Sequence, residues 1–591
     1  MPGQQRLISR FILLLASALW MLPFLVAEHS LPLTTFYPEL FAIAITACLF
    51  LAVLILQAGK PGTLPLPAVL LAPTAFGAVL FVQLAMTRDS RPVPTFLAVF
   101  FLLCVVLALQ AGAWLGQDRE FSRSVLRACA IGSLMGGLLS AAIAWTQAFS
   151  MESHYAGWIA EYTKVEYRRP FAHLFQPNHL GTVLSLSMIS ALYLRQIRVI
   201  GWTVLVIALF MLGIGVALTS SRTAWLQIAV ILAGSIALAA VSRQPGANRL
   251  SQRDSIAPGL VLLAAVAAAQ LLVTWLNRDF GLQLSASAAA RLAETDATSP
   301  RLQLWRYAAD IFLQHPLIGS GWGEFVHAQY LAADRLGQVE MANNAHNIVL
   351  DLLAKTGVLG AAAVLIPCTG WAVRVIKAIR MDSDALNRVF CLVLVAVVLV
   401  HAMLEYPQNY AFFLLPVCLM LGLAETENWK GITRALSLTL STAMVLSVSI
   451  GLVAGYYDYK KIEVAYEQNG AFRYAADPAL IFGDWGRFGL VGMMSLDKEL
   501  LAEKIEMHEH AIALAASPNY IRRYIILLAL DDRADDALLQ VKRLRGLTPG
   551  SFDRQYAWLV AMCDEQNDAL NDFKSRLLRT YGQPKHDKAA G

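Results

Sequence analysis

The chain has 591 residues, of which 57% are hydrophobic and only 15% are charged. A soluble domain carries about a quarter charged residues, so this composition excludes a protein that is surrounded by water over most of its length. The formal net charge of +5 is small, and we expect no nucleic-acid partner.

Apolar runs recur along the chain. A membrane-spanning helix needs about 20 predominantly apolar residues, and by this criterion we predict about thirteen spans. They begin near residues 11, 37, 66, 93, 125, 179, 199, 223, 258, 347, 389, 409 and 435. No small-x-small cleavage site follows the first run, so we interpret it as a retained helix and not as a signal peptide.

The cations between the spans indicate which side each loop faces. If the N-terminus is cytoplasmic, every second connection is basic, as the positive-inside rule requires. These connections hold Lys60; Arg119, Arg123 and Arg127; Arg195 and Arg198; Arg243, Arg249 and Arg253; Arg374, Lys377, Arg380 and Arg388; Lys430 and Arg434. We therefore predict a multi-pass protein of the bacterial inner (cytoplasmic) membrane, with the loops at about 150–178 and about 277–346 on the periplasmic side.

The last part of the chain differs in composition and is polar and rich in helix signals. We predict a transmembrane catalytic domain over 1–456 and a soluble periplasmic domain over 457–591. The segments 496–516, 519–531, 534–547 and 551–565 alternate with short Pro- and Gly-containing breaks. This alternation is typical of paired antiparallel helices of the TPR kind.

Nothing in the sequence indicates a metal or a cofactor. The seven cysteines form no CxxC pair, and six of them lie in apolar runs. The predicted outer side carries no clustered Asp/Glu pair of the kind that holds a divalent cation. We therefore expect neither.

Polar residues gather in the first predicted outer loop. Arg168 and Arg169 precede a stretch that ends in Gln176, Pro177 and Asn178. Asn178 is a good cap for the next span, because its short side chain can accept a backbone hydrogen bond. The loop is either a helix start with two surface arginines or a polar loop that reaches into a site.

Two further arginines lie on the same predicted side. Arg222 follows Ser221 in the hairpin between two spans and has no acidic neighbour in the sequence, which favours an anion over an ion pair. Arg301 follows Ser299 and Pro300, which predict a cap and the first turn of an amphipathic helix. The alternatives are an interfacial arginine beside Trp225 and a helix whose arginines contact lipid phosphates.

Histidines complete the set. His346 stands where the chain re-enters the membrane and is flanked by Asn344 and Asn347. His401 and Glu405 lie one turn apart, on the same helix face, and Tyr406 follows. The alternatives are a structural histidine and a local His–Glu pair that holds the bundle together.

At these residues the chain resembles the O-antigen ligase superfamily (Wzy_C-like), and within it the PglL-type protein O-oligosaccharyltransferases. The superfamily pattern is carried by Ser221-Arg222, by Arg301 with Trp305, and by His346 in Asn344-Ala345-His346-Asn347. The narrower pattern is carried by the stretch from Arg169-Pro170-Phe171 to Gln176-Pro177-Asn178 and by His401 with Glu405-Tyr406-Pro407. The resemblance implies a GT-C-like, all-α polytopic membrane fold.

The resemblance also implies an activity. A glycan would move from an undecaprenyl-diphosphate carrier to a Ser or Thr of a pilin or another periplasmic protein, without metal. Arg222 and Arg301 would stabilise the diphosphate leaving group, and His346 would act as the base, with inversion at the anomeric carbon. Arg168, Arg169, Gln176, Asn178, Asn344, His401, Glu405 and Tyr406 would bind substrate.

Other functions fit the sequence less well. An O-antigen ligase acting on lipid A core, or a polymerase, lacks the narrower pattern and the tail. A transporter of lipid-linked glycan predicts charged residues at mid-span and an inverted repeat, and neither is found. A scaffold leaves the outer-side arginines unexplained.

Overall fold

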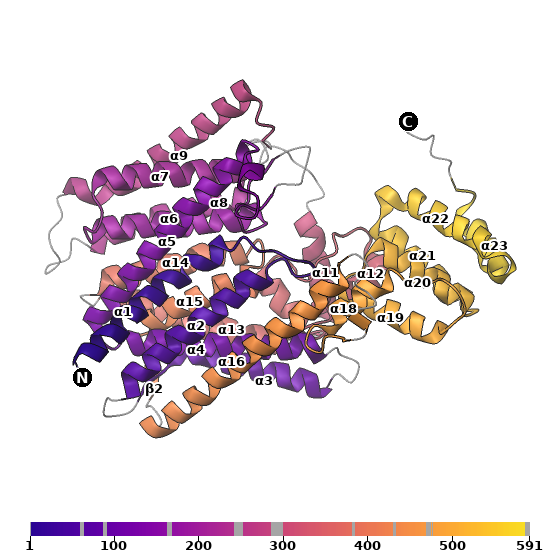
Figure 1. Ribbon diagram of the computed structural model, residues 1–591, viewed down its shortest axis with the longest axis horizontal. Coiled ribbons are helices and arrows are strands. Elements are labelled where there is room, and N and C mark those ends of the chain that lie inside the picture. Colours follow the sequence, from indigo (N-terminus) through magenta and orange to yellow (C-terminus); the bar gives the residue numbers. More distant parts are fainter. Residues whose placement is uncertain are drawn as a thin grey trace. The chain divides into compact units, whose positions relative to one another are not determined.

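The computed structural model describes residues 2–58, 64–86, 92–161, 168–241, 252–284, 300–380, 384–429, 433–467, 474–475 and 477–584. It is helical almost throughout (Figure 1), and its strands are β1 (Leu66–Pro67) and β2 (Asn428–Trp429), which pair antiparallel. The chain divides into two compact units. The first comprises Met1–Ala78, Leu97–Asp296 and Ala362–Ala454, and the second comprises Val79–Phe96, Ala297–Ala361 and Gly455–Gly591.

Every predicted span coincides with a helix, which confirms an all-helical polytopic membrane protein. Ten helices in the described residues are long and apolar enough to cross a membrane. They are α2 (Phe36–Ala58), η2 with α3 (Ala68–Leu70 and Leu71–Met86), α4 (Pro92–Leu115), α5 (Arg119–Ala148), α7 (Trp202–Thr219), α8 (Arg222–Val241), α9 (Gln252–Phe280), α13 (Ile348–Ile379), α14 (Ala385–Ala402) and α16 (Arg434–Ala465). The other three predicted spans fall on α1 (Pro2–Leu19), α6 (Pro177–Gln196) and the shorter α15 (Ala411–Ala424), so the number thirteen stays a prediction.

Helix α6 lies at the centre of the first unit. Its residues from His179 to Leu194 are all buried, and α5, α7, α8 and α14 pack around it. The hydroxyls of Ser185 and Ser190 each donate to the carbonyl four residues earlier, at 2.8 and 2.7 Å, so these buried groups are paired within the helix. A helix that faces other helices and not lipid can carry such polar residues. This explains why α6 is less hydrophobic than the ten membrane-spanning helices named above.

Two glycines let α4 and α15 approach closely in the first unit. A Cβ built on Gly112 would lie 2.3 Å from the carbonyl oxygen of Leu419, and one on Gly422 would lie 2.1 Å from that of Leu109. Small residues at membrane helix interfaces allow such backbone contact.

We expect Gly422→Ala to lower the stability of the protein, because the added methyl overlaps backbone that cannot move away. Overpacking of this kind costs about 1–3 kcal/mol. The matched control is Gly455→Ala in α16, where no atom lies within 4 Å of the added methyl. Helix propensity makes that change neutral or stabilising by up to about 1 kcal/mol. Thermal unfolding of both variants in detergent measures the difference, and equal midpoints would contradict the packing.

The second unit joins the predicted outer loop to the tail. It contains α11 (Pro300–Gln314), α12 (Phe325–Leu336), the start of α13, and the tail helices α18 (Gly483–Val491), α19 (Leu501–Leu514), α20 (Pro518–Leu530), α21 (Ala534–Leu547), α22 (Phe552–Glu565) and α23 (Asn571–Tyr581). One apolar core runs through it, from Tyr307 and Tyr330 in the loop helices to Ile525 and Val541 in the tail. The Tyr330 hydroxyl donates to Oε1 of Gln540, at 2.6 Å.

The four helices predicted in the tail are confirmed within a few residues as α19 to α22. The TPR character and the division of the chain at 456 and 457 stay predictions. The short 3-10 helices are η1 (Leu22–Leu25), η3 (Glu152–Tyr155), η4 (Pro407–Asn409), η5 (Pro549–Ser551) and η6 (Asn567–Leu570). Ser299, the predicted cap of α11, and the loop cations Lys60, Arg243, Arg249 and Lys430 lie outside the described residues.

Candidate functional site

In the first unit, the N-terminal end of α6 gathers several of the predicted site residues. Asn178 donates to Oε1 of Glu405 at 3.1 Å, and Thr182, one turn later, lies 2.9 Å from Nδ1 of His401. His401 and Glu405 therefore both face α6. The prediction that they share one helix face was wrong, because α14 ends at Ala402 and Glu405 lies in the turn beyond it. His401 is fully buried and Glu405 is 4% exposed, so these polar contacts form in a water-poor environment where they are strong.

Helix α8 extends this polar group. The Ser221 hydroxyl donates to Oδ1 of Asn178 at 2.7 Å, and its oxygen accepts the N–H of Ala224 at 3.3 Å. Gln227, which is fully buried, donates to Oγ1 of Thr182 at 2.7 Å. Asn178, Ser221, Thr182, Gln227, His401 and Glu405 thus form one connected set, which we call the α6 polar cluster.

Arg222 begins α8 directly beside this cluster. Ser220, two residues earlier, has a left-handed backbone (φ 50°) that turns the chain sharply at the end of α7. The Arg222 side chain is exposed, and it stands in the first turn of α8, where backbone N–H groups favour anions. Arg169 donates through Nε to the carbonyl of Thr219 at 3.1 Å, so it braces the turn that presents Arg222.

Arg168 makes contacts that hold its own loop in place. It donates to the carbonyl of Gln147 at 2.7 Å and pairs with Glu152 at 3.1 Å. Its N–H also donates to the carbonyl of Gln283, at 2.7 Å. The bond to the Glu152 carboxylate balances part of the charge of Arg168.

The prediction that Asn178 caps α6 was wrong. Gln176 is the N-cap, and its side-chain oxygen accepts the N–H of His179 at 2.8 Å. Pro177 takes the first helical position, where a missing N–H costs nothing. Asn178 is then already inside the first turn, and its side chain is directed to Glu405 and Ser221. Tyr406 is half-buried, with its ring 5.7 Å from that of Tyr410.

In the second unit, His346 lies half-buried on a short loop that is tied down on both sides. Ala345 is fully buried, and its N–H donates to Oδ1 of Asp351 at 2.9 Å. Asn347 caps α13 by accepting the N–H groups of Val349 and Leu350, both at 3.1 Å. His346 itself has a left-handed backbone (φ 51°), which is uncommon outside glycine and typical of tightly determined loops.

A buried lysine supports this loop. Lys355 is 3% exposed and donates to Oδ1 of Asn344 at 2.6 Å and to Asp351 at 3.0 Å. Its Nζ also lies 5.2 Å from the ring centre of Trp322. Asp351 thereby connects Lys355 to the backbone of Ala345, next to His346. Sequence reasoning gave Asp351 and Lys355 no role, although an Asp–Lys pair four residues apart at the start of an apolar helix was a signal for one.

The glycine-rich turn at 319–323 is explained by packing. A Cβ on Gly319 would lie 2.3 Å from the backbone of Lys355, and one on Gly357 would lie 2.3 Å from that of Leu317. Both glycines have positive φ, and Gly357 marks a break in the helical geometry of α13. The turn thus holds the chain against the Lys355 region.

Arg301 occupies the first turn of α11, which has the predicted amphipathic pattern, with Leu304, Tyr307, Ala308 and Ile311 buried. Ala308 and Ile311 share a small apolar cluster with Ala345, so α11 and the His346 loop rest on one core. Asp310 and Arg335 tie α11 to α12 through two bonds of 2.7 and 2.6 Å. The Arg335 guanidinium holds the pKa of Asp310 below its usual value.

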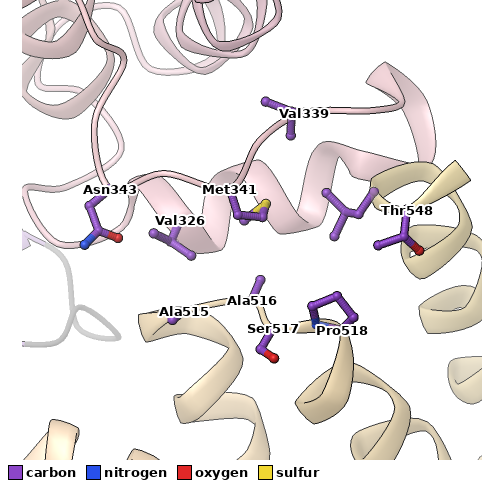
Figure 2. Close-up of a pocket in the computed structure, with 10 residues that line it drawn as sticks. Val326, Val339, Met341, Asn343, Ala515, Ala516, Ser517, Pro518 and Thr548 are labelled. Atoms are coloured by element: carbon purple, nitrogen blue, oxygen red, sulfur yellow. The ribbon is translucent and has the colours of Figure 1, made fainter. Parts of the chain in front are cut away.

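A groove of about 390 Å³ lies beside the segment that leads to His346 (Figure 2). One side of the groove is formed by α12 and the coil that follows it. The other side is formed by the turn between α19 and α20 and by the end of α21. Its lining residues are Val326, Val339, Met341, Asn343, Ala515, Ala516, Ser517, Pro518, Leu547 and Thr548.

The structure brings together the α6 polar cluster in one unit, and Asn344 with His346 in the other. The proposal that Arg222, Arg301 and His346 act on one substrate stays a prediction. Among the described residues, no group of three or more His, Cys, Asp or Glu side chains could hold a metal ion.

Comparison with known proteins agrees with these motifs. The family described as "O-Antigen ligase" matches residues 206–365, and that described as "Virulence factor membrane-bound polymerase, C-terminal" matches 389–561. The chain is 25% identical over 572 residues to the "General O-oligosaccharyltransferase" of Acinetobacter baylyi, which covers 93% of this chain and 94% of that protein. It is 29% identical over 263 residues to the "ComP-specific O-oligosaccharyltransferase" of the same organism, covering 44% of this chain and 45% of that protein. The chain is thus similar to the O-antigen ligase family over residues 206–365 and to a protein O-oligosaccharyltransferase along most of its length.

Proposed function

We propose that this protein transfers a complete glycan from a lipid-diphosphate carrier to a hydroxyl group of an acceptor protein. The observation that carries this proposal is the alignment with a general O-oligosaccharyltransferase along 93% of the chain, which includes the tail as well as the membrane helices. It is supported by the position of His346 on a loop that buried groups hold in place.

The donor is proposed to be undecaprenyl-diphosphate-linked glycan, which would be held by arginines. When the bond between the anomeric carbon and the phosphate oxygen breaks, negative charge develops on the diphosphate. The guanidinium groups of Arg222 and Arg301 can bind phosphate with two hydrogen bonds each, so they can stabilise this charge without a metal. Arg169 supports Arg222 through the Thr219 carbonyl.

The acceptor is proposed to be a Ser or Thr of a pilin or another periplasmic protein. His346 accepts the hydroxyl proton as the oxygen attacks the anomeric carbon, because a neutral imidazole has a ring nitrogen with a free lone pair that can take a proton. The new carbon–oxygen bond forms as the old one breaks, so the anomeric configuration inverts. The α6 polar cluster, Gln176, Asn344 and Tyr406 offer amide, carboxylate and hydroxyl groups that can bind sugar hydroxyls or orient the acceptor.

The proposal includes the sidedness of the reaction. The alternating basic loops support an inner-membrane protein with thirteen spans, a cytoplasmic N-terminus and a TPR-like periplasmic tail. Donor, acceptor and His346 then meet on the periplasmic face.

A cell that makes both a lipid-linked glycan and lipopolysaccharide tests the function. When the chain is expressed with a candidate pilin, we expect the intact mass of the pilin to increase by one glycan and the lipopolysaccharide to stay unchanged. Glycan on lipid A core alone would support an O-antigen ligase, and longer glycan chains on the carrier lipid would support a polymerase. Either result without modified protein would contradict the proposal.

A further inference from the structure

The coil between α12 and His346 includes a short stretch whose backbone groups have no partner among the described residues. Tyr307 donates to the carbonyl of Gly337, and the N–H of Ala342 lies 3.4 Å from Oε1 of Gln329. Between these points, the N–H and carbonyl groups of residues 338–341 bond to no other described residue. We call this stretch the open segment. A row of unpaired backbone N–H and carbonyl groups is a place where another extended chain can add.

The groove described above runs along the open segment (Figure 2). Val339 and Met341 line it on this side, and Ala515 and Pro518 face them from the tail. Its volume of about 390 Å³ is within the range of ligand sites. None of the ten lining residues is charged or aromatic.

The lining residues indicate which kind of molecule the groove can bind. A lipid diphosphate needs cations, which the lining residues do not supply. A glycan chain would find no aromatic ring to stack on and only three polar side chains, those of Asn343, Ser517 and Thr548. An extended peptide needs unpaired backbone groups for its main chain and apolar space for its side chains, and the open segment and the groove offer these.

We propose that an extended, uncharged stretch of the acceptor polypeptide pairs with the open segment and places its side chains in the groove. This inference rests on the proposed function, because it assigns a binding site to the acceptor of that reaction. The place in the sequence supports it. Asn343 lines the groove, and His346 follows three positions later. Three residues span at most about 11 Å, so an acceptor in the groove brings a neighbouring hydroxyl close to the base.

The groove is expected to restrict which acceptor sequences are modified. It would contact residues within about three positions of the modified Ser or Thr, since an extended chain rises about 3.3–3.6 Å per residue. Small apolar residues fit there. A charged residue at those positions would be buried without a partner, which is unfavourable.

Steady-state transfer to a purified acceptor tests the groove. Ala515→Trp fills it, and Met341→Glu places a charge in it. The matched controls are Ala502→Trp and Met493→Glu, both at exposed positions in the same unit. We expect each groove variant to raise the KM for the acceptor at least tenfold, with the KM for the lipid-linked donor within twofold of the wild type. The controls should change neither constant.

The outcomes distinguish a failure of the proposed function from a failure of the proposed groove. Wild-type protein that transfers no glycan to protein would overturn the proposed function. Active wild-type protein with an unchanged acceptor KM in both groove variants would overturn only the groove. A raised donor KM instead would assign the groove to the glycan, which also contradicts the inference. The unfolding midpoint of each variant shows whether it is folded. If Ala515→Trp does not fold, Met341→Glu alone tests the groove.

Discussion

Replacing His346 with alanine is expected to reduce glycan transfer by a factor of about 10²–10⁴, because a positioned general base contributes this much. The hydroxyl of Ser or Thr is a weak nucleophile until its proton is removed. Asp351 and Asn347 hold the loop by its backbone on either side of His346, so the loop should survive loss of the imidazole. The measurement is the fraction of glycosylated pilin over time, by intact mass, at equal levels of membrane-inserted protein.

The control for this experiment is His510→Ala, which removes an exposed histidine from α19 in the tail. It should transfer glycan at the wild-type rate. If His346→Ala also transferred at that rate, the base would have to be another group, and the role given to this loop would be wrong.

The second large effect is expected from Lys355→Met. The side chains of Lys355 and Asp351 are each only 4% exposed, so the substitution leaves a carboxylate buried without its cation. Breaking a buried ion pair on one side costs about 3–5 kcal/mol. The loop also loses the bond from Lys355 to Asn344. We therefore expect a lower unfolding midpoint and at least a tenfold loss of transfer in the fraction that stays folded.

A double variant distinguishes the effect of the unpaired charge from the effect of the altered side-chain shape on stability. In Asp351→Asn with Lys355→Met, no charge is left buried, and the asparagine oxygen can still accept the N–H of Ala345. We expect the double variant to be more stable than Lys355→Met alone. Lys542→Met provides the surface comparison, since that lysine is 60% exposed beside Asp334 and such pairs contribute about 0–1 kcal/mol. Equal stability of Lys355→Met and the wild type would show that the buried pair is not structural.

The helices were largely predictable from the sequence, because apolar length decides where a chain crosses a bilayer. Helix α6 shows the limit of this argument. It carries His179, Thr182, Ser185 and Ser190, yet it is buried, since its neighbours are protein and its hydroxyls bond to its own backbone. Hydropathy indicates whether a segment prefers lipid or water. It does not indicate which other helix a residue contacts.

The candidate site was predictable in its residue types but not in its connections. The spacing of His401 and Glu405 predicted one helix face, whereas α14 ends at Ala402 and the turn after it directs Glu405 at α6. That Asn178 would contact Glu405, 227 positions away in the sequence, could not be read from local pattern. The role of Gly319 was missed for the same reason, because it depends on the backbone of Lys355 in a distant segment. The pair of Lys355 with Asp351, four residues away, is local and had a signal in the sequence.

The packing of the tail was also not predictable. The α11 and α12 segments and the tail helices each have an apolar face, and the sequence does not say which faces meet. In the structure they share one core, and Gly546 is a glycine because a Cβ there would lie 2.2 Å from the carbonyl of Ala333. The groove beside the open segment arises only from this pairing.

Transfer in a purified system tests the central claim most directly. The full chain is reconstituted in liposomes with an undecaprenyl-diphosphate-linked glycan, an acceptor protein with one modifiable serine, and a metal chelator. The intact mass of the acceptor should rise by one complete glycan, and the rise should depend on His346. An unchanged acceptor mass, with the glycan still on its lipid or lengthened there, would contradict the account.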